Sequence, residues 1–224
     1  WVAKNSTLYF KPGITYSALS GKGFAGRLMP QGFCFDCAGD CLFPENHDVL
    51  GAYLGLLNSS VARGFLSFVN PTLNVNTEDL DRIPIPAKLS GMLSTLSDRA
   101  VQLMQTAETE DETSYDFIAP PAWVAGVERV TTRHRDLAEL EREIDEEVYR
   151  LYEISPADRQ AIEEELASAP ASEGKDGDEE AEAGEETPEA DAASLTVEEL
   201  AQRWVSYAIG IALGRFARAG LEHL

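Results

Sequence analysis

Six residues near the start of the chain combine side-chain types that proteins use to contact nucleic acid. They are the cations Lys11, Lys22 and Arg27 and the hydroxyl-bearing residues Thr15, Tyr16 and Ser17. Lysine and arginine contact phosphates, and hydroxyl groups contact phosphates or base edges. These residue types permit contact with DNA, but taken alone they favour an ordinary solvated hairpin, because residue types do not by themselves specify base readout.

A second group with possible ligand chemistry consists of Cys34, Cys37 and Cys41, followed by His47. A zinc site needs four nitrogen or sulfur ligands, commonly as two short-spaced pairs, and this sequence has no second pair. The spacing also differs from the usual iron–sulfur patterns. We therefore expect no metal and interpret the cysteines as small hydrophobic residues of a β-segment.

The sequence predicts no catalytic residues. His47, His134 and His223 lie far apart, and the carboxylates of residues 139–147 fit the solvated face of a helix. The glycines between Gly21 and Gly26 lack the strand-to-helix frame that a phosphate-binding loop needs. No pairing of a nucleophile with a base stands out in the sequence.

The elements that position the six candidate residues follow from the apolar pattern. Short apolar runs at residues 8–10, 14–16 and 33–35 alternate with Gly and Pro turns, which indicates short strands and hairpins. Asp48 is the predicted N-cap of one long amphipathic helix that ends near Phe68. Its apolar positions recur at helical spacing: Leu50, Leu54, Leu57, Val61 and Phe65.

Helical patterns dominate the rest of the chain. Residues 88–107 predict a second helix, and an apolar stripe from Leu137 to Leu151 predicts a third. A capping box from Thr196 to Glu199 opens the last helix. We predict an α+β fold with four parts: a β-rich recognition module containing the long helix (1–86), a helical spacer (87–162), an acidic flexible linker (163–193) and a C-terminal helix (194–224).

The acidic residues are distributed unevenly. The 224 residues carry a net charge of -21, yet residues 1–76 are near neutral at +1. Residues 77–162 carry -10 and residues 163–192 carry -12. The net charge of the whole chain therefore does not exclude DNA binding by the first segment.

Composition also suggests where the protein is found. No apolar run reaches the roughly 20 residues of a membrane helix, so no membrane partner is expected. Three cysteines without a disulfide framework favour a reducing, cytoplasmic location. The first residues lack a secretory pattern and an initiator methionine, so we expect the chain to be part of a longer protein.

Several segments together resemble one family. They are Tyr9 to Ser17 (YFKPGITYS), Arg27 to Phe33 (RLMPQGF), Tyr53 to Ser60 (YLGLLNSS), Asn70 to Asn74 (NPTLN), Leu80 to Pro86 (LDRIPIP), Glu146 to Tyr152 (EEVYRLY), Ser155 to Asp158 (SPAD) and Trp204 to Phe216 (WVSYAIGIALGRF). In this order they are similar to the C-terminal part of the large adenine-specific DNA methyltransferases of phage-defence and restriction systems. This is the bacteriophage-exclusion (BREX) PglX and type IIG restriction-modification family.

The resemblance implies a target-recognition role without methyl transfer by this chain. Together with the local charge, it predicts that DNA is contacted by the six residues described first: Lys11, Thr15, Tyr16, Ser17, Lys22 and Arg27. The family's adenine-holding Asn-Pro-Pro-Tyr loop and its glycine-rich cofactor loop are both missing, and Asn70-Pro-Thr lacks the second proline and the aromatic residue. No cofactor is therefore expected in this chain, whereas S-adenosylmethionine is implied for the parent enzyme. The implied partners are double-stranded DNA, the N-terminal methyltransferase domain of the same protein and further defence-system subunits. The alternative is a protein–protein docking module that uses its acidic helical surface without touching DNA.

Overall fold

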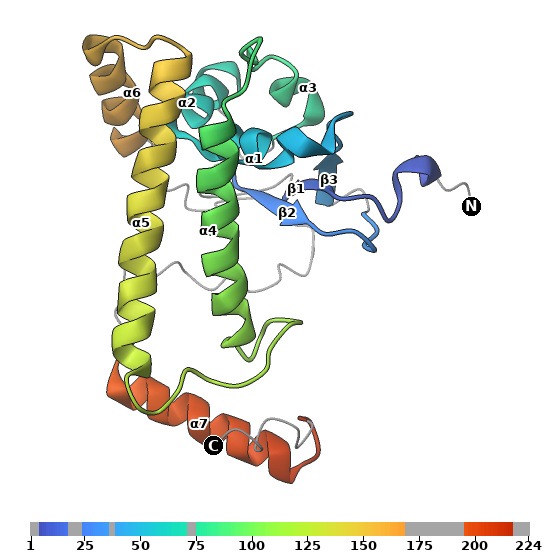
Figure 1. Ribbon diagram of the computed structural model, residues 1–224, viewed down its shortest axis with the longest axis vertical. Coiled ribbons are helices and arrows are strands. Elements are labelled where there is room, and N and C mark those ends of the chain that lie inside the picture. The colour runs from blue at the N-terminus through green and yellow to red at the C-terminus, as the bar shows by residue number, and fades with distance from the viewer. Residues whose placement is uncertain (1–4, 18–23, 36–38, 71–74, 169–194, 217–224) are drawn as a thin grey trace, which may run out of the picture. The chain divides into compact units, whose positions relative to one another are not determined.

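The computed structural model describes residues 5–17, 24–35, 39–70, 75–168 and 195–216 (Figure 1). Seven α-helices and one three-stranded sheet lie within these ranges, which confirms the predicted α+β class. The chain divides into two compact units. Unit 1 comprises Trp1–Arg99 and Leu140–Asp178, and unit 2 comprises Ala100–Glu139 and Glu179–Leu224.

The sheet of unit 1 is antiparallel, with strand order β2-β1-β3. Its strands are β1 (Gly13–Ser17), β2 (Gly26–Met29) and β3 (Gly39–Leu42). The predicted strand at residues 14–16 is confirmed, whereas the runs at 8–10 and 33–35 are not strands. Phe10 adopts a left-handed φ of 65°, which breaks an extended path, and Ser6–Leu8 forms a 3₁₀ turn, η1. The aromatic residues of those runs instead contact one another, with Tyr9 and Phe35 rings 5.3 Å apart.

The predicted long helix is divided in two. A 3₁₀ turn, η2 (His47–Val49), capped by Asn46 rather than Asp48, leads into α1 (Leu50–Asn58). Ser59 is extended, at φ -68° and ψ 157°, and its hydroxyl caps α2 (Ser60–Val69) by accepting from the Ala62 N–H. The apolar spacing continues across this break because Leu57 and Val61 are both buried on either side of it.

Unit 1 is closed by α3 (Thr77–Leu80), the first part of α4 (Gly91–Thr109), the last part of α5 (Gly126–Leu151) and α6 (Pro156–Ser168) (Figure 1). Glycines allow two close helix contacts. A Cβ on Gly55 of α1 would lie 2.3 Å from the Ser97 hydroxyl of α4, and one on Gly64 of α2 would lie 3.1 Å from Ile162 of α6. The core includes Ile14, Leu56 and Leu93, all fully buried.

Unit 2 forms around α7 (Val197–Ala212) and the first part of α5. The predicted capping box is confirmed, since the Thr196 hydroxyl accepts from the Glu199 N–H while the Glu199 carboxylate accepts from the Thr196 N–H. Leu200 and Tyr207 of α7 are buried, and Ala208 is exposed. A Cβ on Gly210 would lie 2.3 Å from the Phe216 ring, so this glycine admits an aromatic side chain of its own unit.

Two boundaries differ from the sequence prediction. Helix α5 begins at Gly126, well before the apolar stripe, and α6 continues to Ser168, so the first residues of the predicted linker are helical. The remainder of that linker lies outside the described residues. Within the described part of the chain, no single helix is long and apolar enough to cross a membrane, and only the bent pair His47–Asn58 and Ser60–Val69 reaches that length and composition when its two arms are taken together.

Candidate nucleic-acid interface

The register of the sheet places two of the predicted DNA-contact residues side by side. Thr15 of β1 lies opposite Arg27 of β2 and opposite Cys41 of β3. Side chains alternate between the two faces of a strand, and Ile14 and Tyr16 take the buried face. Thr15 and Arg27 therefore share the other face, called the outer face below.

The outer face carries an exposed cation. Arg27 is exposed, and among the described residues it has no ion-pair partner. Ser17 lies half-buried at the end of β1, in register with Gly39, and points to the same face as Thr15. Lys11 is exposed two residues before β1. Lys22 lies outside the described residues.

Tyr16 does not belong to this surface. Its side chain is 1% exposed, and its ring centroid lies 5.2 Å from that of Phe24. Its hydroxyl donates to Asp40 at 3.4 Å. Burial, followed by the nearby Asp40 carboxylate, raises the pKa of this hydroxyl. The predicted contact from Tyr16 to DNA does not fit this burial, because strand alternation turns its side chain into the core.

The two described cysteines, Cys34 and Cys41, lie in different surroundings. Cys34 is exposed and outside any strand, which corrects its interpretation as a β-segment residue, while Cys41 is half-buried in β3. Burial raises the pKa of the Cys41 thiol, and a hydrogen bond with Thr15 opposes part of that rise. Cys37 lies outside the described residues. Within the described ranges, no three His, Cys, Asp or Glu side chains come together as metal ligands.

One residue of the site was missed by the sequence reasoning. Asn58, the last residue of α1, hydrogen-bonds the backbone of Gly26, the residue before Arg27. Asn58 belongs to the YLGLLNSS segment, which contributed to the family resemblance but gave no indication of this contact. Hydrogen bonds between residues 32 positions apart follow from tertiary structure alone.

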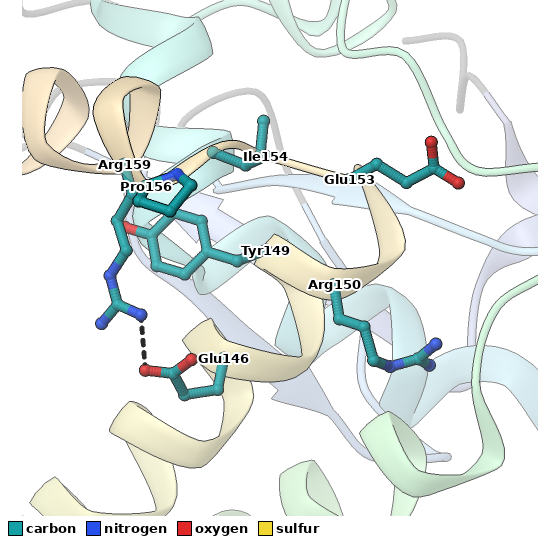
Figure 2. A pocket seen from close by; sticks show the side chains of 7 residues that line it. All are labelled: Glu146, Tyr149, Arg150, Glu153, Ile154, Pro156 and Arg159. Carbon is teal, nitrogen blue, oxygen red and sulfur yellow. Dashed lines mark hydrogen bonds and ion pairs between the residues drawn. The ribbon is translucent and has the colours of Figure 1, made fainter.

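The EEVYRLY segment lines a pocket of about 480 Å³ between the end of α5 and the start of α6 (Figure 2). The Arg159 guanidinium lies 4.7 Å from the centroid of the Tyr149 ring. It donates to Glu146 at 2.6 Å and to Glu163 at 2.8 Å, and these hydrogen bonds raise its pKa further. The bond of Arg159 to Glu146 thus links α6 to α5, and the other cation of the lining, Arg150, is bound by Glu147. Both cations of the pocket are therefore paired with carboxylates.

Asp145 links α5 to the start of α2. Its carboxylate accepts from the Ser60 N–H at 2.7 Å and from the Ser60 hydroxyl at 2.6 Å. A carboxylate at a helix N-terminus satisfies donors that have no partner inside the helix. This contact thus fixes the α1–α2 break, and with it Asn58, relative to α5.

The Asn70 segment is engaged in the same kind of local bonding. The Asn70 amide donates to Asp79 at 2.7 Å, and the Asp79 carboxylate also accepts from the Asn76 N–H at 3.0 Å. These hydrogen bonds lower the pKa of Asp79. Asn70 is therefore bonded to the carboxylate that forms the capping box of α3 with Asn76, which does not fit a role in holding a substrate base or a cofactor.

Comparisons with known proteins give relatives but no family model that matches. The chain is 34% identical over 116 residues to the adenine-specific methyltransferase BrxX of Escherichia coli O9:H4 (strain HS), which covers 51% of this chain and 10% of that protein. It is 28% identical over 113 residues to the adenine-specific methyltransferase PglX of Lacticaseibacillus casei (strain Zhang), which covers 50% of this chain and 9% of that protein. The matched stretch thus spans about a tenth of the length of these relatives. About half of this chain is homologous to part of such BREX adenine-specific methyltransferases, and the resemblance predicted from the sequence is confirmed.

Proposed function

We propose that this chain is the DNA target-recognition portion of an adenine-specific DNA methyltransferase of a phage-defence or restriction-modification system. The observation that carries the proposal is the pairing of Thr15 with Arg27 on the outer face of the sheet. An arginine can contact a phosphate or the edge of guanine, and a threonine hydroxyl beside it can contact a base. The homology to adenine-specific methyltransferases supports DNA as the ligand of this face.

The charge distribution supports the same location. Residues 1–76 carry a net charge of +1, whereas the rest of the chain is strongly acidic. Only a surface without excess negative charge can approach the DNA backbone closely, because each phosphate is itself negative. We assign phosphate contacts to Arg27 and Lys11 and base contacts to Thr15 and Ser17. Lys22, predicted from the sequence as a further phosphate contact, stays part of this proposal.

The chain supplies recognition, and the parent enzyme supplies the methyl-transfer chemistry. S-adenosylmethionine is the methyl donor that such a parent would use. Two described residues, Asn70 and Gly26, are engaged in contacts within unit 1, since Asn70 bonds Asp79 and Gly26 is a strand residue bonded to Asn58. The methyl-transfer step is therefore assigned to other residues of the parent enzyme.

A second candidate function is docking of another part of the same polypeptide. Unit 2 exposes large apolar side chains, including Val124 and Leu213 at 81% each and Trp123 at 58%. Contiguous exposed apolar residues mark interaction surfaces, and Trp123 and Val124 are adjacent in the chain. About nine tenths of each relative lies outside the match. This favours the methyltransferase domain of the same polypeptide as the partner that binds these apolar residues.

The test uses the full-length parent methyltransferase. Arg27→Ala should weaken binding to all DNA sequences and reduce the slope of log affinity against log salt by about 1. Thr15→Val should instead change the preferred base at one position of the site, by about 1–3 kcal/mol. Arg135→Ala, an exposed arginine of α5, is the matched control and should leave both unchanged.

Binding constants across a salt series and sequencing of methylated sites measure these effects. If Arg27→Ala and Thr15→Val both behave like the Arg135→Ala control, DNA is read elsewhere. The docking function is then the better account of the chain.

A further inference from the structure

The side chain of Asn58 bonds both backbone groups of one strand residue. Its carbonyl oxygen accepts from the Gly26 N–H at 2.8 Å, and its amide nitrogen donates to the Gly26 carbonyl at 3.0 Å. The same nitrogen donates to the Leu54 carbonyl of α1 at 3.1 Å. The carboxamide therefore uses its acceptor and its donors at once, which fixes its orientation.

This pairing occurs at the edge of the sheet. In the described sheet β2 has β1 on one side only, and Gly26 lies in register with Tyr16 of that strand. Backbone groups on the free side of an edge strand have no strand partner. Asn58 supplies the two hydrogen bonds that the next strand would have supplied at Gly26.

The neighbouring residue is the cation of the outer face. Gly26 belongs to the buried face, since a Cβ there would lie 3.1 Å from Ile14, and Arg27 therefore points the opposite way. The contact that holds the Gly26 backbone therefore also determines the position and direction of the Arg27 side chain. A side chain on a pinned strand loses less freedom on binding than one on a frayed edge.

We propose that Asn58 is a positioning residue for DNA recognition, pinning Gly26 of β2 so that Arg27 is held ready on the outer face. This inference rests on the proposed function of that face. It also gives a reason for the break after α1. Ser59 is extended, so α1 ends at Asn58 and the carboxamide can reach across to β2.

Asparagine suits this position because it is short and carries both a donor and an acceptor. Leucine has nearly the same shape and offers neither. Ser59→Ala provides a matched control one residue away, because it removes the cap of α2 without touching Gly26. A general loss of stability should therefore appear in both variants, whereas loss of positioning should appear only in Asn58→Leu.

The experiment uses the full-length parent methyltransferase as wild type and with Asn58→Leu, Ser59→Ala or Arg27→Ala. Hydrogen–deuterium exchange of the peptide that spans β2 reports the Gly26 N–H. Affinity for a DNA duplex containing the methylated site is measured across a salt series. We expect Asn58→Leu to lose protection in β2 and to weaken DNA binding about fivefold, approaching the effect of Arg27→Ala. Ser59→Ala should keep both properties at their wild-type values.

Three results would overturn the inference. If Arg27→Ala weakens binding but Asn58→Leu does not, Arg27 acts without help from Asn58, and the proposed function stands alone. If Ser59→Ala weakens DNA binding as much as Asn58→Leu, the effect is one of stability and not of positioning. An Arg27→Ala variant with unchanged binding marks the separate failure of the proposed function, and the inference falls with it.

Discussion

In unit 1, hydrogen bonds from side chains to backbone groups fix a sheet edge and a helix break, whereas in unit 2 a cluster of aromatic rings lies beside long-range contacts such as Trp204 to the Pro121 carbonyl. Asn58 bonds Gly26, and Asp145 bonds Ser60 across 85 positions. In unit 2, the rings of Phe117, Tyr207 and Phe216 lie 5.1 to 5.7 Å from one another. Hydrogen bonds have strict geometry, while ring packing tolerates small shifts. The comparison indicates that the bonds of Asn58 and Asp145 hold particular backbone positions in unit 1, whereas the ring cluster of unit 2 contributes mainly buried area.

The largest expected effect lies in the aromatic cluster. Tyr207 is 3% exposed and contacts Phe117, Phe216 and Trp204. Tyr207→Ala should lower the free energy of unfolding by about 3–5 kcal/mol, because it removes a buried ring and leaves a cavity. Tyr207→Phe keeps the ring and should change stability little. Urea denaturation measures both, and equal losses in the two variants would contradict packing as the main contribution.

The next effect tests the directed bonds of unit 1. Asp145→Ala leaves the Ser60 N–H and hydroxyl without their acceptor and should cost about 2 kcal/mol. Asp136→Ala removes an exposed carboxylate from the same helix and should cost less than about 0.5 kcal/mol. Thermal unfolding of the two variants gives the comparison. Similar midpoints would show that the bond to Ser60 adds nothing beyond surface charge.

A smaller effect concerns the stability of the folded protein at low pH, and it compares the same kind of helix cap in the two units. Backbone hydrogen bonds lower the pKa of Asp79 at α3 and the pKa of Glu199 at α7 below their ordinary values of 3.8 and 4.5. A lowered folded-state pKa means that the stabilisation is complete above the ordinary value and is lost as pH falls through the lowered one. Asp79→Asn and Glu199→Gln should each flatten the acid limb of stability.

Melting temperatures measured from about pH 5 downward test this expectation. Hydrogen exchange assigns each change to its own unit, with Asp79→Asn acting in unit 1 and Glu199→Gln in unit 2. A profile that coincides with that of the wild type in both variants would contradict it.

The smallest effect comes from backbone strain at the two ends of α5. Ala125 before the helix has a φ of 61°, and Glu153 after it has a φ of 53°, both in the left-handed region that favours glycine. Ala125→Gly in unit 2 and Glu153→Gly in unit 1 should each stabilise by about 0.4–1 kcal/mol. Ala161→Gly, at an exposed position inside α6, is the control and should destabilise by about 1 kcal/mol. Chemical denaturation distinguishes the signs, and a loss at Glu153 would mean that its side chain contributes more than its strain costs.

Much of the secondary structure could be predicted from the sequence, because local signals determine it. The helix predicted at residues 88–107 is α4 (Gly91–Thr109), and the capping box at Thr196 opens α7 as expected. The strand at residues 14–16 followed from alternation between turn residues. The resemblance to adenine-specific methyltransferases was likewise carried by short segments in order.

Tertiary structure alone decided the break at Ser59, the burial of Tyr16 and the bond from Asn58 to Gly26. Helical spacing runs through the break unchanged, so the apolar pattern could not reveal that the backbone turns there. Alternation along a strand does not determine which of its two faces is buried. Packing against α1 buried Ile14 and Tyr16, so Thr15 lies beside Arg27 on the outer face. Hydrogen bonds between residues 32 and 85 positions apart have no local signature, because they depend on where the whole chain brings two segments together.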